Sequence, residues 1–329
     1  MSRLGGGPIM ADSPSDAAAM CPPILAIPLP DTAALAGLAV YLAAIAAAAY
    51  AGGSSISFLS LGHRPMQVLL SLTGGVLLGV GMLHLLPHAY VQLGRDLETT
   101  MAWVLVGFFV MFLLERAFHG HAHHAADDGC GHDHGAEHVH HHHDAGGGHP
   151  GPRQWAWCGA FVGLALHSLA DGAALAAAVG ADARHGAGYL AGFATFLAIV
   201  LHKPFDAGMI ATLMIDSAAP PRMRALVNAL YAAVVPLGAV GFLLSLPLFG
   251  GGQDAALGIA MAMAAGAFVC IAAADLLPEV QFHSHDRLLL TTALALGLAL
   301  AWGITALERS SDAHRTHGHG AAPAAVQAR

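Results

Sequence analysis

The chain has 329 residues, of which 56% are hydrophobic and only 10% are charged, and its formal net charge is −8. A soluble globular domain has about 25% charged residues, so this composition excludes an ordinary soluble protein and indicates apolar surface that faces lipid. The negative charge and the scattered Lys and Arg residues exclude a nucleic-acid-binding face. The 4 cysteines have no CxxC spacing, which indicates neither a disulfide framework nor a thiolate zinc site.

The apolar runs along the chain predict an all-α, polytopic membrane protein with eight transmembrane helices. Residues 1–31 lack the basic-then-apolar order of a secretory signal, so we expect a disordered leader. Runs of roughly 18 to 25 apolar residues can cross a hydrocarbon core of about 30 Å as helices. Three such runs lie within residues 32–118 and five within 154–307, and we expect residues 308–329 to be a disordered tail. The runs lie near 32–53, 67–92, 100–118, 155–180, 187–214, 223–248, 255–279 and 288–307.

Residues 119–153 separate the third and fourth spans and are rich in His, Gly, Ala and Asp. This composition cannot bury a core, so we expect a disordered loop. Because histidine is the commonest side-chain metal ligand, we expect the loop to bind metal weakly, as a sensor or local reservoir. A solvated linker with incidental histidines is the alternative. The histidines in question are His119, His121, His123, His124, His132, His134, His140, His141, His142 and His143.

Two consecutive spans carry ionisable residues near their middle at matching spacing. The fourth has His167 and Asp171, and the fifth has His202 and Asp206. Residues four apart lie on one helical face, about 6 Å from each other. Two opposed faces would offer two imidazoles and two carboxylates, a set that suits Zn²⁺, or part of a larger shell for Fe²⁺ or Mn²⁺. Because charges within a membrane are costly, we predict a metal site here rather than a hydrogen bond between helices.

Polar residues beside prolines occur in two further spans. His84 and His88 lie in the second span, and Asp275 and Glu279 lie in the seventh. All four are close to span ends, where a long side chain reaches water easily. They are therefore candidates either for ligands along an ion path or for interfacial groups.

At these residues the chain resembles the ZIP (Zrt/Irt-like) family of metal transporters. The resemblance covers roughly residues 32–307 and depends on His167-Ser168-x-x-Asp171-Gly172, which is similar to HNxxDG, and His202-Lys203-Pro204-x-Asp206, which is similar to HExPxE. It implies that His167, Asp171, His202 and Asp206 line a primary metal site. It also implies a homodimer that moves a divalent metal ion towards the cytoplasm by alternating access. The expected ion is Zn²⁺, with Fe²⁺, Mn²⁺ and Cd²⁺ as alternatives.

The chain departs from the family pattern in three ways: Pro204 is displaced by one residue, and Ser168 and Lys203 occupy the positions that serve a second adjacent ion in the family. A protonated lysine has three donors and no acceptor, so it cannot ligate a cation. We predict that Lys203 takes the place of the second ion, so that each protomer transports one metal. The alternative is that Lys203 points away from the site and pairs with a remote acid.

Short-loop Arg residues predict the orientation in the membrane. The side that holds the His-rich loop carries Arg64, Arg116, Arg153, Arg222, Arg224 and Arg287, whereas the opposite loops carry Arg95 and Arg184. This bias predicts that the loop lies in the cytoplasm, and we expect the protein to lie in the inner membrane of a bacterium. The tail residues Arg309, Arg315 and Arg329 argue the other way.

Three other functions compete with a ZIP-like transporter. Cation-diffusion-facilitator exporters also have HxxxD spans and His-rich loops, but they have six spans and then a soluble domain. An intramembrane metalloenzyme would ordinarily need an HExxH pair, and the chain has none, so we predict that the protein is not an enzyme. A metal sensor that transports nothing is the third alternative.

Overall fold

The computed structural model describes residues 32–55, 63–119, 156–184, 187, 190–282 and 287–318, and within these ranges the chain forms helices and no strand. The helices before the His-rich loop are α1 (Thr32–Ser55), α2 (His63–Val80), the π-helical η2 (Gly81–Leu85), α3 (Leu86–Gln92) and α4 (Leu97–His119). Those after it are α5 (Ala156–Arg184), α6 (Phe193–Asp216), α7 (Pro221–Ser245), the 3-10 helix η6 (Leu246–Gly252), α8 (Gln253–Phe282) and α9 (Arg287–Gly318).

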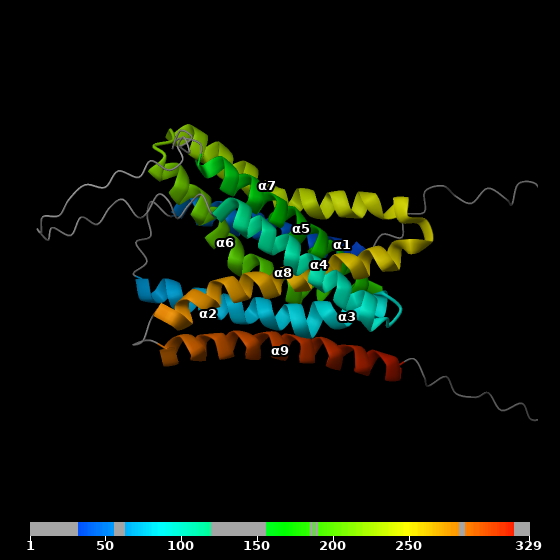
Figure 1. Cartoon of the computed structure of the whole chain (residues 1–329). Helices are drawn as coiled ribbons and strands as arrows, with labels where there is room; N and C mark the ends of the chain where they lie inside the picture. Colours follow the sequence, from blue (N-terminus) through cyan, green and yellow to red (C-terminus); the bar gives the residue numbers. More distant parts are fainter. Residues whose placement is uncertain are drawn as a thin grey trace, which may run out of the picture.

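The described helices cross the molecule eight times, which confirms the predicted all-α membrane fold. Seven stretches are long and apolar enough to span a membrane, and the longest, Pro221–Ala274, has 54 residues. A straight helix of that length would measure about 81 Å, far more than a bilayer core. The chain instead turns back at η6, where Gly250 has a φ of 52°, so that α7 and α8 are separate passages (Figure 1). Conversely, α2, η2 and α3 follow one another as one passage.

Successive passages run in alternate directions (Figure 1). The first passage begins and the last one ends where a short turn joins α3 to α4. We call this the α3–α4 end, and we call the opposite end, where α4 ends and α5 begins, the α4–α5 end. At the α3–α4 end, Asp96 accepts hydrogen bonds from the Thr99 hydroxyl and from the backbone N–H of Glu98 and Thr99. These bonds hold the pKa of Asp96 below its ordinary value and cap the start of α4.

Glycines allow four helix pairs to pack closely. The pairs are α2 with α9, α4 with α8, α5 with α7, and α1 with α6. A Cβ atom added to Gly172 on α5 would meet the carbonyl oxygen of Val235, and one added to Gly238 on α7 would meet that of Leu169. The first two pairs show the same reciprocal contact, at Gly75 with Gly297 and at Gly107 with Gly266, and Gly52 of α1 contacts Pro204 of α6. Small residues therefore perform the role expected of them in lipid, where no hydrophobic force joins helices.

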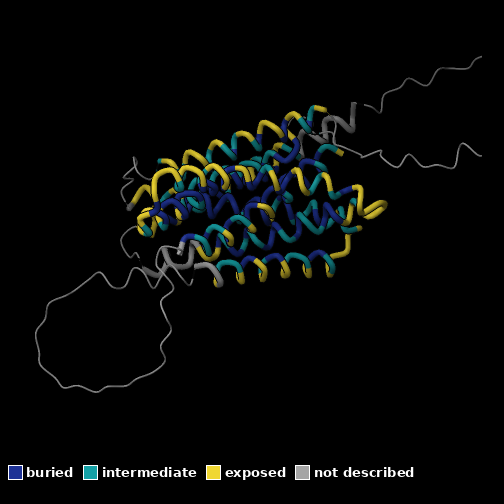
Figure 2. The backbone as a smooth tube through the Cα atoms, turned by 90° about the horizontal axis from the view of Figure 1, so that it is seen from above, coloured by how far each residue is buried: buried dark blue, intermediate teal, exposed yellow. Residues whose placement is uncertain are grey.

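The helix contacts divide the molecule into two bundles. The first bundle consists of α1, α5, α6 and α7, which pack mainly on each other. The second bundle consists of α2 with η2 and α3, α4, α8 and α9. The interface between them is formed chiefly by α5 against α8 and α4, and by α6 against α2. Buried residues follow this interior along the length of the helices, and exposed ones lie outside (Figure 2).

Two boundaries differ from those predicted. The fifth span begins at Phe193, not near residue 187, because Gly192 precedes it with a φ of 73°, a left-handed conformation that interrupts a helix. The last helix continues to Gly318, so the expected disordered tail from residue 308 begins as helix. Residues 308–317 contain neither Gly nor Pro, and α9 ends at the first glycine beyond them. The predicted leader and residues 120–153 of the predicted His-rich loop lie outside the described residues.

Candidate metal centre

The four residues of the paired motif meet in the first bundle. Two of them, His167 and Asp171, lie on α5, and the other two, His202 and Asp206, lie on α6. The Nε2 atoms of His167 and His202 lie 3.2 and 3.3 Å from Asp171 Oδ2, and His202 Nε2 lies 3.9 Å from Asp206 Oδ2. His167, Asp171 and His202 are buried, and each offers a ligand atom within 4.8 Å of the others.

The hydrogen bonds of His202 determine which of its nitrogens can bind a cation. Its Nδ1 lies 2.9 Å from the backbone oxygen of Ala198. A carbonyl only accepts, so Nδ1 carries the proton and Nε2 of the neutral ring presents a lone pair. This nitrogen lies 3.3 Å from Asp171 Oδ2. An imidazole nitrogen with a free lone pair and a carboxylate oxygen this close together can both be ligands of one metal ion.

Lys203 points into the same cluster and is completely buried. Its Nζ lies 2.6 Å from Asp171 Oδ2 and 2.8 Å from Asp206 Oδ2, and it donates to Ser168 Oγ at 3.0 Å. These contacts exclude the alternative that Lys203 points away from the site. With neutral imidazoles, the two carboxylates and one ammonium give the cluster a formal charge of −1.

Tyr231 of α7 belongs to this cluster, although no motif in the sequence pointed to it. Its hydroxyl donates to Asp206 Oδ2 at 3.2 Å and lies 3.0 Å from Ser168 Oγ. A hydrogen-bonded chain therefore leads from Lys203 through Ser168 and Tyr231 to Asp206. Tyr231 is buried and is 63 residues from Ser168 in the sequence, so no local spacing could have identified it.

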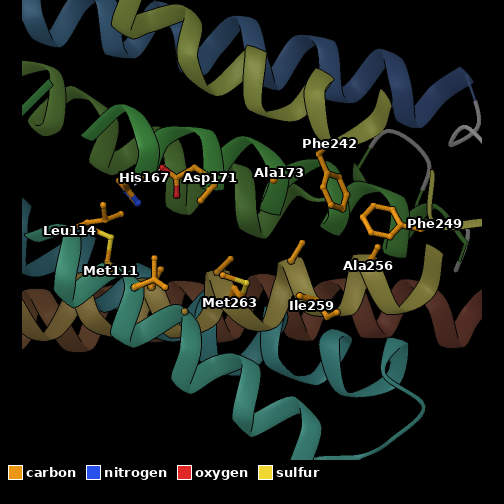
Figure 3. Close-up of a pocket in the computed structure, with 16 residues that line it drawn as sticks. Met111, Leu114, His167, Asp171, Ala173, Phe242, Phe249, Ala256, Ile259 and Met263 are labelled. Atoms are coloured by element: carbon orange, nitrogen blue, oxygen red, sulfur yellow. Dashed lines mark ion pairs between the residues drawn. The ribbon is translucent and has the colours of Figure 1, made fainter. Parts of the chain in front are cut away.

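A cavity of about 320 Å³ lies beside the cluster at the interface of the two bundles. Figure 3 shows His167 and Asp171 near one end of it and Phe242 and Phe249 near the other. Across the cavity from α5 are Met111 and Leu114 of α4 and Met263 of α8 (Figure 3). Apart from His167 and Asp171 its lining is apolar, so the polar cluster is the part of this cavity that can attract an ion.

The other predicted residues are not gathered at this cluster. His84 and His88 lie at the α3–α4 end, where they approach Asp182 of α5 and Glu308 of α9. Neither carboxylate was selected from the sequence, although Asp182 is three helical turns beyond Asp171 on the same helix. Asp275 and Glu279 lie in α8, but their side chains are outside the described residues. The same holds for the side chains of all the selected histidines of the loop.

A comparison with known protein families finds a match for the chain. Residues 33–305 match the family described as the ZIP zinc transporter. This match includes helices of both bundles and every residue of the cluster on α5 and α6. No curated protein sequence matches the chain closely enough to serve as a named relative.

Proposed function

The chain belongs to the ZIP zinc transporter family, and from this premise we propose that it carries Zn²⁺ across the membrane on His167, Asp171, His202 and Asp206. As a family member it is a multi-pass membrane protein of a class that transports divalent metal. Membership of this family favours a ZIP-type transporter over the three alternatives, which are a cation-diffusion-facilitator exporter, a metalloenzyme and a sensor. The observation that carries the proposal is the convergence of two imidazole nitrogens on the Asp171 carboxylate.

The donor set supports zinc as the ion. Two imidazole nitrogens and two carboxylate oxygens can complete the tetrahedral shell that Zn²⁺ prefers, with bonds of about 2.0 to 2.2 Å. Mg²⁺ and Ca²⁺ prefer oxygen ligands alone, so nitrogen donors disfavour them. Fe²⁺, Mn²⁺ and Cd²⁺ are the other ions that this set accommodates, with water or further ligands completing a larger shell.

We propose that one Zn²⁺ is transported at a time, because Lys203 holds the place of a second cation. Its ammonium lies between the carboxylates of Asp171 and Asp206 and lowers their mutual repulsion while the site is empty. When Zn²⁺ binds, the formal charge of the cluster changes from −1 to +1. Without Lys203 the empty site would have a charge of −2, which is costly in a low-dielectric interior.

The arrangement of the bundles supports transport by alternating access. Every residue of the cluster belongs to α5, α6 or α7, so the first bundle can carry the whole site as one unit. Phe268 of α8 packs against the ring of His202, with the ring centroids 6.1 Å apart, so the second bundle closes one side of the site. Movement of the first bundle against the second would then expose the site to one side of the membrane at a time.

The further parts of the proposal concern orientation and assembly. The arginine bias places the α4–α5 end and its His-rich loop in the cytoplasm of a bacterium, with uptake directed towards that side. The loop histidines would then buffer the ion that is released there. In a homodimer, contacts with the partner protomer would hold the second bundle fixed. The first bundle could then move relative to it.

Flux of radioactive zinc into proteoliposomes tests the proposal. We expect uptake by the parent protein that saturates with zinc, and its loss in Asp171→Asn and Asp206→Asn, which keep the size of the side chain and remove its charge. Asp254→Asn is the matched control, because Asp254 lies on α8 and pairs with Arg184 outside the cluster. Uptake by both cluster variants at the parent rate would show that the ion binds elsewhere.

A further inference from the structure

A second cluster of histidines and carboxylates lies along the same face of α5 as the first. Asp182 follows Asp171 by 11 residues, which is close to three helical turns and about 16 Å along the axis. The intervening positions on this face, Leu175 and Ala178, are completely buried. In this conformation an apolar layer therefore separates the two clusters, and the second is a site of its own.

Three side chains of the second cluster can share one ion. His84 comes from the π-helical segment η2, His88 from α3 and Asp182 from α5. His88 Nδ1 lies 3.0 Å from Asp182 Oδ1, and His84 Nε2 lies 3.7 Å from Asp182 Oδ2. Each of the three offers a ligand atom within 4.8 Å of the others, as at the first cluster. Two imidazole nitrogens and one carboxylate form a three-ligand set of the kind that binds zinc with an open fourth position.

Neighbouring groups hold these ligands in a suitable orientation. Glu308 Oε2 lies 3.0 Å from His84 Nδ1, which favours the proton on that nitrogen and leaves Nε2 to face Asp182. The backbone N–H of Gly192 donates to Asp182 Oδ2 at 2.7 Å. Carboxylates and backbone groups that fix a histidine or an acid in this way are typical of the surroundings of metal ligands.

The local backbone of the second passage brings the two histidines together. In η2 the N–H of Leu86 donates to the carbonyl of Gly81, five residues earlier, and Pro87 has no N–H to continue the regular pattern. The rings of His84 and His88 lie with their centroids 4.5 Å apart. Single π-helical turns of this kind are common at functional sites. His84 is buried, whereas the side chain of His88 is 33% exposed and gives an ion access.

We propose that His84, His88 and Asp182 bind a second divalent transition-metal ion, separate from the transported one, and that this ion joins the two bundles at the α3–α4 end. The two histidines belong to the second bundle and Asp182 to the first. Relative movement of the bundles would pull the ligands apart, so bound metal stabilises the conformation seen here. The proposal rests on the proposed function only for the choice of zinc as the metal.

Zinc binding to the purified full chain, measured by equilibrium dialysis, tests the site. We expect His84→Gln/His88→Gln to bind one ion fewer per chain than the parent. Asp254→Asn, at a carboxylate near the same end that pairs with Arg184, should bind as many as the parent. The single variant His88→Gln, at a partly exposed position, should lose the same ion if the double variant fails to fold. Equal numbers in the parent and in a folded His88→Gln protein would overturn the proposal.

Amide hydrogen exchange with and without Zn²⁺ tests the link between the bundles. Zinc should slow exchange across residues 182–192 in the parent and in Asp254→Asn, and should have no such effect in His88→Gln. A slowing of the same size in all three proteins would contradict the link. Asp171→Asn separates this proposal from the transport function, because that variant should lose zinc flux and keep the zinc-dependent slowing.

Discussion

The two clusters on α5 have similar ligands but differ in which helices supply them. His167, Asp171, His202 and Asp206 all belong to the first bundle, so the proposed movement of the bundles would leave the central cluster intact. His84 and His88 lie on the second bundle and Asp182 on the first, so the same movement would separate the residues at the α3–α4 end. On this proposal the same donor chemistry serves two purposes. A site within one rigid group can carry an ion, whereas a site between two groups can only respond to their relative position.

The clusters also differ in what neutralises their acids. In the central cluster a buried lysine lies between two carboxylates. At the α3–α4 end, Asp182 and Glu308 approach histidines. A lysine supplies a permanent positive charge, whereas a histidine has a lone pair to offer when it is neutral. The central cluster is therefore expected to hold its shape without metal, and the other to gain more from binding it.

The largest effect should come from Lys203→Met, which removes the permanent positive charge from the central cluster. Loss of one partner from a buried ion pair costs about 3 to 5 kcal/mol, because the remaining charges are left uncompensated. We expect a lower unfolding temperature in detergent without metal, a larger gain in stability on adding zinc, and a second ion bound in the central cluster. Arg184→Gln, at a partly exposed ion pair, is the control and should change stability by about 1 kcal/mol at most. Lys203→Met with the stability and zinc content of the parent would contradict the role of Lys203.

His202→Ala should have the next largest effect, because it removes a ligand from the bundle that carries the ion. We expect the apparent affinity for zinc in the flux assay to fall by about 100-fold, which corresponds to about 2.7 kcal/mol. Thr212→Ala on the same helix is the control, since the Thr212 hydroxyl donates to the backbone oxygen of Gly208 and not to the cluster. If His202→Ala and Thr212→Ala had the same affinity, His202 would not be a ligand.

A smaller effect is expected from Tyr231→Phe. This variant tests how much the hydrogen bond from α7 contributes to the central cluster. The variant removes one hydrogen bond to Asp206 and keeps the aromatic ring. A single hydrogen bond to a charged group contributes about 1.5 to 3 kcal/mol at most, so we expect a moderate loss of zinc affinity with flux retained. Complete loss of flux in a folded variant would mean that Tyr231 acts on the ion directly.

The smallest effect on flux should follow deletion of residues 120–149. A segment without fixed geometry cannot define a selective site, so we expect a change in apparent affinity or regulation and a maximal rate close to that of the parent. A well-expressed deletion without any flux would place these histidines on the ion path.

The sequence predicted the helices well because a long apolar run in lipid has no other way to satisfy its backbone. The boundaries at Phe193 and Gly318 were missed for local reasons. Gly192 adopts a left-handed conformation that the apolar character of residues 187–192 conceals, and the polar residues after Glu308 continue the helix although they are too polar for a span.

Within the central cluster, spacing alone identified the residues of each helix, because positions four apart share a face. Spacing could not show that Lys203 and Tyr231 turn towards the same acids, since this depends on how α5, α6 and α7 pack. Asp182 and Glu308 were missed for the same reason. Their histidine partners lie on the second passage, and no repeat in the sequence connects them.

Anomalous diffraction at the zinc edge, from crystals of the protein without residues 120–149, tests the central claim most directly. The account predicts one ion in the central cluster, at about 2.0 to 2.1 Å from the Nε2 atoms of His167 and His202, with Lys203 Nζ still near Asp171. Two adjacent ions between α5 and α6, or none, in crystals that contain zinc would contradict it.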